Sequence, residues 1–280
     1  MDIQIVKATP IELRTDARTS EVFHQIVDTC LRHATANVSQ IAEQNADAVH
    51  QTRIGIRRLR SAIALFGEQL DKPTRRAATR ELRHLGKRLS PVRDWDVFIA
   101  DTLPKLPLQA NDSVSMRTGA LNLRTTAYHA IDYSAFEKLS TSVNAIVLNG
   151  PDLDEPIFET APDLLGRQAR KMKRCLKHLD TDEQRHALRK TLKKLRYSVE
   201  FLGSLYDDKT VKRYVDHCKD AQDALGLMND TTTTISLLNA LVYDPKVKTE
   251  VLAWAQKRQD KSIENVSTVT HALRSAKRFW

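Results

Sequence analysis

The sequence contains few of the residues that interrupt helices. Of its 280 residues, 8 are glycine and 9 are proline, and the strict alternation of polar and apolar residues that is typical of half-buried strands is almost absent. Long stretches instead place apolar residues at positions i, i+3, i+4 and i+7, with charged residues between them. The sequence therefore predicts an all-α fold.

Cysteines and long apolar runs are also scarce. The three cysteines, Cys30, Cys175 and Cys218, are odd in number and show no CxxC spacing, so the sequence indicates neither a disulfide framework nor a zinc site. No stretch approaches the uninterrupted apolar length of a membrane span, and the N-terminus lacks the apolar core of a signal peptide. We therefore expect a cytoplasmic protein without a membrane partner.

Sequence motifs of common enzyme classes are missing. The chain contains no GxxxxGK[ST], GxGxxG or HExxH motif, and no glycine-rich turn that would cradle a nucleotide phosphate. We therefore expect a binding protein with no catalytic residues and no cofactor.

Positive charge is what the sequence has in excess. Its 44 Lys and Arg outnumber its 35 Asp and Glu, which gives a formal net charge of +9 and a pI of about 9.5. This balance favours polyanionic partners such as nucleic acid, polyphosphate or an acidic membrane surface. Aromatic residues make up only 6% of the chain and no recognition helix or RNA-binding module is recognisable, so nucleic acid is expected to bind only non-specifically.

Apolar periodicity and proline positions divide the chain into segments. Helices are expected near residues 17–44, 46–70, 73–90, 92–103, 112–131, 133–148, 162–179, 182–206, 208–226, 229–242 and 245–278, the last of them broken in two. The proline-rich, acidic stretch over residues 149–163 resembles a linker. We therefore expect an N-terminal extension over residues 1–17 and a single domain over residues 18–278, made of a first repeat (about 18–148), the linker and a second repeat (about 164–278).

The two halves of the chain match each other at an offset of 136 residues. Without a gap, HQTRIGIRRLR (50–60) aligns with HALRKTLKKLR (186–196), and LSPVRD (89–94) aligns with LGLMND (225–230). Charge is kept even where identity is not, because arginines of the first copy stand opposite lysines of the second. The match predicts an internal duplication.

Each matching segment gathers its cations on one side of a helix. Within a stripe of about 80°, successive cations lie about one turn apart along the axis. The two stripes consist of His50, Arg53, Arg57 and Arg60, and of His186, Arg189, Lys193 and Arg196. Apolar residues such as Leu59 and Leu195 occupy another face, so each helix is expected to bury one side and present a row of cations on another.

A row of cations of this kind suits a chain of phosphates. Guanidinium groups hold phosphate oxygens in a bidentate fork, and ammonium groups act as mobile point charges. A histidine beside a polyanion gains charge, because nearby negative charge favours the imidazolium form. Tyr197, about 20° from His186 on the helical wheel, can donate its hydroxyl to the same face.

The motifs of the two halves resemble those of a known family. HxxRxxxRRLR followed by LxxxRDWD in the first half, and HxLRKxLKKLRYxxE followed by LGxMND in the second, resemble the CHAD family, named for conserved histidines in an α-helical domain. The resemblance covers about residues 18–278. It implies two four-helix bundles related by pseudo-twofold symmetry, with a basic surface and a central channel that bind inorganic polyphosphate, often at polyphosphate granules.

The family pattern, carried over residue by residue, implies a set of candidate polyphosphate-binding residues. They are His50, Arg53, Arg57, Arg58, Arg60, His186, Arg189, Lys190, Lys193, Lys194, Arg196 and Tyr197. Lys190 lies at the edge of the second stripe. The two copies differ where Ser90 stands opposite Gly226 and Arg93 opposite Asn229, and the second difference weakens the case that Arg93 and its counterpart are both ligands.

Further residues have a structural role or extend the site. Asp94 and Asp230 are expected to begin helices, where a carboxylate accepts backbone N–H groups. Candidate extensions of the site are the basic run Arg167, Arg170, Lys171 and Arg174, and the pair Arg83 and Lys219, which match at the same offset. For these residues a merely solvated surface is an equally good interpretation.

Several alternatives stay open. The alternating ExExK strand of the triphosphate hydrolases to which CHAD domains are often fused is missing, so polyphosphate is expected to be bound rather than hydrolysed. Metal binding is disfavoured, because Arg and Lys surround both His50 and His186 and no second His, Cys or carboxylate follows either histidine three or four residues later. The two histidines either contact the ligand or serve helix packing. General polyanion or nucleic-acid binding, and a helical scaffold for phosphate-metabolism enzymes, are the alternative functions.

Overall fold

The protein is helical throughout. The computed structural model describes residues 4–151, 153–241 and 244–280, apart from the side chains of 227–230, 261–265 and 267–269. These residues form ten α-helices and no strand, which confirms the predicted all-α fold. The α-helices are α1 (Thr19–Thr35), α2 (Val38–Ala42), α3 (Ala46–Leu65), α4 (Lys72–Val97), α5 (Ala110–His129), α6 (Ser134–Leu148), α7 (Ile157–Cys175), α8 (Asp182–Leu202), α9 (Asp208–Ala240) and α10 (Pro245–Ser275). A π-helical turn (Phe98–Thr102) and two 3-10 turns (Leu103–Lys105 and Gly203–Leu205) follow α4 and α8.

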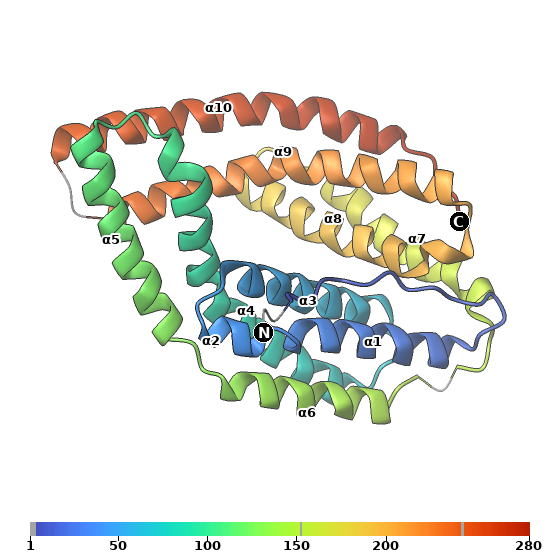
Figure 1. The fold of residues 1–280 in the computed structure, drawn as a ribbon. Coiled ribbons are helices and arrows are strands. Elements are labelled where there is room, and N and C mark those ends of the chain that lie inside the picture. Colours follow the sequence, from blue (N-terminus) through green and yellow to red (C-terminus); the bar gives the residue numbers. More distant parts are fainter. Residues whose placement is uncertain (1–3, 152, 242–243) are drawn as a thin grey trace.

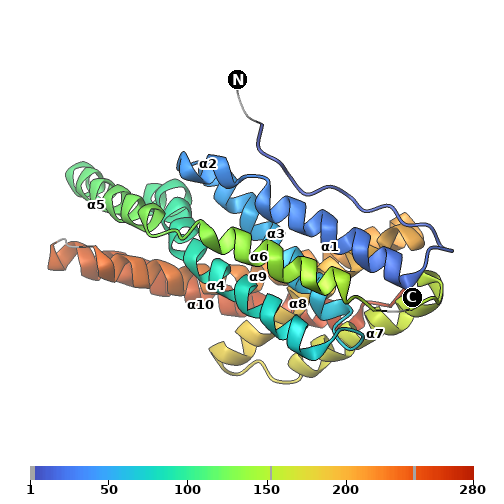
Figure 2. The ribbon, with the colours of Figure 1, turned by 90° about the horizontal axis from the view of Figure 1, so that it is seen from below.

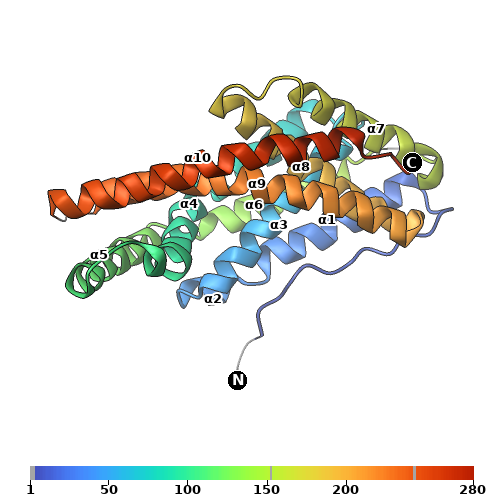
Figure 3. The same ribbon diagram turned by 90° about the horizontal axis from the view of Figure 1, so that it is seen from above.

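Apart from α2 and α5, the α-helices of the described residues form two groups of four, which can be followed in Figure 1. In the first group α3 packs against α1 and α4, and α6 packs against the same two helices from below (Figure 2). In the second group α8 packs against α7 and α9, and α10 lies along α9 (Figure 3). Where the groups meet, α3 packs against α8, and buried apolar side chains of both groups form one continuous core. The two helices predicted to carry the cations therefore meet at the centre of the fold.

A smaller hydrophobic core lies at the end of the molecule that contains α5. It joins the C-terminal end of α4 and the turns that follow α4 to α5, α9 and α10. Its buried members are Trp95, Phe98, Leu103, Leu106, Met116, Ala120, Leu238, Leu241 and Val251. This cluster fixes the far ends of α4 and α9 to each other.

The four central helices α3, α4, α8 and α9 all begin at a polar cap. The side chains of Asn45 and Asp71 accept backbone N–H groups in the first turns of α3 and α4. At an offset of 136 residues, Thr181 and Asp207 do the same for α8 and α9. Such caps satisfy N–H groups that the first turn of a helix leaves without a partner. The capping positions of these helices thus correspond at the same offset as the sequence motifs.

Proline does not end α4. The helix break predicted at Pro91 is wrong, because α4 continues from Lys72 to Val97. Pro91 is exposed, while Leu89, Val92 and Trp95 on the inner face are buried. The packing of that face keeps the chain helical, although proline cannot donate its backbone hydrogen bond.

The helix starts predicted at Asp94 and Asp230 are wrong as well. Asp94 lies inside α4 and Asp230 inside α9, which has no break near residues 226–229; the Asp230 side chain lies outside the described residues. The predicted break in the last helix is also absent, since α10 is continuous. Long α9 and α10 support each other by packing along their length. Even so, no helix in the described part of the chain is long and apolar enough to cross a membrane.

The N-terminal extension and the predicted linker are both tied to the helices. Asn37 interrupts the helix predicted over residues 17–44, because its side chain accepts from Val6 N at 2.8 Å and donates to Val6 O at 2.9 Å. The helix α7 begins at Ile157, so residues 157–163 of the predicted linker are helical. The remaining linker pairs with the start of α1 through a bridge between Arg18 and Pro156.

Candidate functional site

A cavity of about 740 Å³ lies where the two helix groups meet. Its walls come from α3, α4, α8 and α9 and from the turn after α4. Its described cationic lining consists of Arg53, Arg57, Arg60, Arg83, Lys87, Arg93, Arg189, Lys190, Lys193 and Lys194, joined by His50 and His186. Among the described lining residues Asp94 is the one carboxylate, so the cavity concentrates positive charge.

On the α3 wall, Arg53 is held in place by α4. Its Nη1 donates to the Gly86 carbonyl oxygen at 3.2 Å and to Ser90 Oγ at 2.9 Å. Burial, and then the charge of Arg57, lowers the pKa of Arg53 to about 10. The guanidinium group stays protonated at neutral pH, and an anion in the cavity would stabilise that charge.

The half-buried His50 lies beside other cations of the same cavity. Burial lowers the pKa of His50 below its usual 6.5, and the charges of Arg93 and Arg57 lower it further. Among these neighbours the imidazole is therefore mostly neutral at pH 7. An anion beside it would reverse this effect and favour the protonated ring.

The α8 wall presents its charges nearer the surface. His186 and Lys190 are exposed, whereas Arg189, Lys193 and Lys194 are half-buried. Burial, followed by the charge of Arg60 across the cavity, lowers the pKa of Lys194. The two stripes therefore face each other closely enough for their cations to repel.

Two candidate residues lie outside the cavity lining. Arg58 is 5% exposed, donates from Nη2 to the Thr9 carbonyl oxygen at 3.2 Å, and lies 5.5 Å from the centre of the Phe201 ring. Arg196 pairs with Glu200 at 3.4 Å and lies over the ring of Tyr197. All other candidate residues, including the buried Tyr197, line the cavity.

The α4 wall was largely missed by the sequence prediction. Arg83 was a candidate extension, but Lys87 and Arg93 were not part of the predicted site, although both line the cavity. The spacing of Arg83, Lys87 and Asp94 places them on one face of an unbroken helix. The predicted end of the helix at Pro91 hid only the continuation of this face to Asp94, since Arg83 and Lys87 both lie within the helix predicted over residues 73–90.

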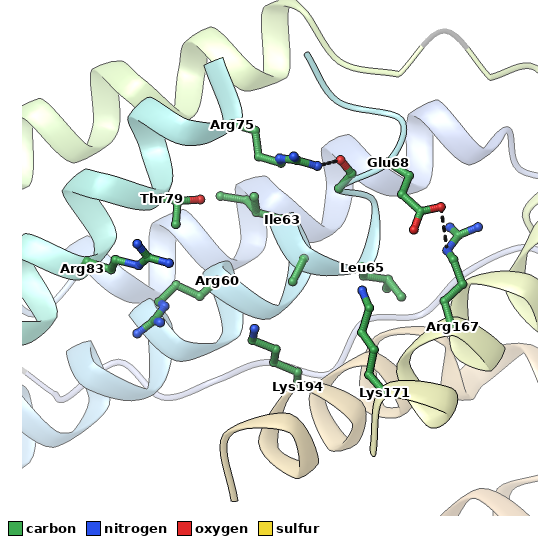
Figure 4. A pocket seen from close by; sticks show the side chains of 12 residues that line it. Arg60, Ile63, Leu65, Glu68, Arg75, Thr79, Arg83, Arg167, Lys171 and Lys194 are labelled. Carbon is green, nitrogen blue, oxygen red and sulfur yellow. Dashed lines mark hydrogen bonds and ion pairs between the residues drawn. The ribbon is translucent and has the colours of Figure 1, made fainter. Parts of the chain in front are cut away.

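Part of the basic run on α7 lies close to the cavity. Arg167 and Lys171 line a neighbouring pocket of about 340 Å³, the side pocket, which shares Arg60, Arg83 and Lys194 with the cavity (Figure 4). Arg170 and Arg174 are exposed and line neither. Lys219 also lies outside the cavity lining and pairs with Asp216 at 3.4 Å.

The thiols take no part in the cavity. All three cysteines are free, and Cys30 and Cys218 are fully buried. Burial raises the pKa of each of these two thiols to about 12, which keeps them protonated. Among the described residues, no three His, Cys, Asp or Glu side chains come together in a group that would hold a metal ion.

Comparisons with known proteins agree with this architecture. The family model of the CHAD domain matches residues 25–239. The crystal structure of the CHAD domain from the plant Ricinus communis is similar with a TM-score of 0.79 and 25% identity, over 99% of this chain and 98% of that one. PptA from Streptomyces chartreusis has a TM-score of 0.63 and 13% identity over 93% of this chain and 99% of its own, a likeness of fold alone. No curated protein sequence matches significantly.

Proposed function

The chain belongs to the CHAD domain family, and from that premise we propose that it binds inorganic polyphosphate in the central cavity without cleaving it. The observation that supports this proposal is the meeting of two cationic helix stripes, from α3 and α8, across one cavity. Arginine forks and lysine ammonium groups hold phosphate oxygens, and a row of them follows a linear polyanion through many contacts.

The shape of the site favours a thin polyanion over nucleic acid. A cavity of about 740 Å³ admits a single phosphate chain, whereas a duplex is far too wide to enter it. Single-stranded nucleic acid is usually held by aromatic stacking as well as charge. The aromatic side chains of the described lining are Phe98, which is buried, and Tyr197, whose ring is covered by Arg196. Nucleic acid is therefore the second candidate, bound non-specifically at the surface by counterion release.

The cellular role that fits such binding is attachment to polyphosphate granules in the cytoplasm. A protein that holds the polymer without consuming it also suits recruitment of enzymes of phosphate metabolism. We propose granule association as the main role and enzyme scaffolding as its alternative.

The test is calorimetric titration with polyphosphates of graded length, with duplex DNA as competitor, at fixed ionic strength. We expect length-dependent binding that DNA barely competes, and a loss of at least about tenfold in affinity for the double variant Arg53→Ala with Arg189→Ala. The control removes two exposed positive charges outside the cavity, Lys138→Ala with Lys257→Ala, and should change affinity less than about twofold. Equal competition by DNA, or equal losses in both double variants, would contradict the proposal.

A further inference from the structure

The side pocket continues the cavity toward α7. Six cations line it, of which Arg60, Arg83 and Lys194 belong also to the cavity, while Arg75, Arg167 and Lys171 belong to the side pocket alone. Glu68 is the one carboxylate of that lining. Figure 4 shows Lys171 and Lys194 pointing into the same space from α7 and α8. Positive charge therefore runs without interruption from the cavity to exposed Lys171.

The opposite end of the cavity differs. There a pocket of about 120 Å³ shares Val97, Thr102 and Thr234 with the cavity. Its charged lining is two cations, Lys105 and Arg258, against the carboxylate of Asp101. The two ends of the cavity thus differ in charge, and the excess of cations lies at the end toward α7.

Cations are crowded where the cavity opens into the side pocket. Burial lowers the pKa of Lys194, and Arg60, Lys171 and Arg83 lower it further. Burial, and then Arg83, lowers the pKa of Arg60. Because like charges repel at short distance, an anion bound at this junction would reduce the repulsion among several cations at once.

The cations beyond the junction are held in two different ways. Arg75 donates to the Gly67 carbonyl oxygen, and a Cβ at position 67 would lie 3.2 Å from Arg75 Nη1 and 3.0 Å from the Ile63 oxygen, so glycine leaves the room for this approach. Arg167 instead pairs with the carboxylate of Glu68, whose side chain is 65% exposed, at 3.5 Å. An ion pair this long, with one partner mostly exposed to solvent, is weak and exchangeable.

We propose that the side pocket is a second phosphate subsite, into which a linear polyphosphate continues from the cavity and where its following phosphates displace Glu68 from Arg167. This inference rests on the proposed function and adds the direction in which the bound polymer runs. The polymer fills the cavity first and leaves it on the α7 side. Chains too short to reach beyond Arg60 and Lys194 do not use the subsite.

The first test compares matched double variants at the two ends. Arg167→Ala with Lys171→Ala removes two charges of the side pocket, and Lys105→Ala with Arg258→Ala removes two at the opposite end. Calorimetry with long-chain polyphosphate and with tripolyphosphate, each over a series of salt concentrations, measures affinity and salt dependence. For Arg167→Ala with Lys171→Ala we expect about tenfold weaker binding of long chains and less than about twofold change in affinity for tripolyphosphate. The slope of log affinity against log salt concentration for long chains should be smaller by about 2.

The second test removes the competing carboxylate. Glu68→Gln leaves an exposed, nearly isosteric side chain, so the fold should be kept, and long-chain affinity should rise by about threefold without a change for tripolyphosphate. Unchanged or weaker long-chain binding would contradict the displacement of Glu68.

The possible outcomes distinguish a failure of the subsite from a failure of the proposed polyphosphate binding. If the wild-type protein binds no polyphosphate, the proposed function fails and the subsite fails with it. If the wild type binds and Arg53→Ala with Arg189→Ala weakens all chain lengths, but both end variants lose equally or neither loses, the cavity assignment stands and the subsite is overturned.

Discussion

The helices α3 and α8 carry the same stripe in sequence but present it differently. At the offset of 136 residues Arg58 corresponds to Lys194, and Arg60 corresponds to Arg196. On α3, Arg60 lines the cavity while Arg58 is buried behind it; on α8, Lys194 lines the cavity while Arg196 does not. The second helix is therefore turned about its axis relative to the first. Equivalent positions have therefore exchanged roles, one lining the cavity and the other packing outside its lining.

The two walls also differ in the residue that stands opposite their first arginine and in the burial of their histidine. Arg53 on α3 donates to Ser90 of α4, whereas the residue equivalent to Ser90 in the second copy is Gly226. His50 is half-buried, while its counterpart His186 is exposed. The histidine of the α3 wall is thus the more deeply buried of the two, and the α8 wall offers charges closer to solvent.

The exchange of roles predicts opposite effects at one pair of equivalent positions. Arg58→Ala should lower the free energy of unfolding by about 2 kcal/mol, because it removes buried packing and the hydrogen bond to Thr9, and it should leave polyphosphate affinity unchanged. Lys194→Ala should change stability by less than about 0.5 kcal/mol and weaken binding by about fivefold. Urea denaturation and calorimetry measure the two quantities. Similar behaviour of both variants would show that the helices are not turned as described.

The difference in burial predicts a difference in pH dependence. Burial and neighbouring arginines lower the pKa of His50, and this pKa should rise when a polyanion binds, so binding takes up a proton. Affinity should therefore increase as pH falls from about 8 to about 6, by up to tenfold for each unit by which the pKa rises. His50→Gln should flatten this profile more than His186→Gln. Equal profiles for the wild type and His50→Gln would rule out a contact between His50 and the anion.

The difference in anchoring predicts the smallest effect. A Cβ at Gly226 would lie 3.9 Å from Arg189 Nη2, an ordinary contact, so Gly226→Ser places a hydroxyl where it can hold Arg189 as Ser90 holds Arg53. We expect a gain of about 0.5 kcal/mol in stability from replacing a helical glycine, and about twofold tighter binding from the added hydrogen bond to the arginine. Ser90→Gly is the reverse control. Weaker binding by Gly226→Ser would show that a hydroxyl at position 226 does not improve the site.

Local signals in the sequence were reliable for helices and unreliable for their ends. The apolar periodicity predicted helical structure over most of each long helix, although α4, α9 and α10 were each predicted in two pieces. Polar caps such as Asn45 and Thr181 mark true helix starts. Pro91 and the stretch before Asp230 were interpreted as breaks, because single-residue propensities were weighed without the neighbouring helices. Burial of one face over the whole length of α4 and α9 outweighs a few missing hydrogen bonds.

By itself, the sequence determined the all-α fold, the excess of positive charge, and the stripe residues that recur at one offset, because period and charge are local properties of the chain. Only the tertiary structure decided that α4 adds Lys87 and Arg93 to the cavity, that Arg58 and Arg196 lie outside its lining, and that the side pocket extends it toward α7. A helical wheel fixes the angle between side chains on one helix. It leaves open the rotation of that helix against its neighbours, which is set by the packing of its apolar face and selects the cations that face the cavity.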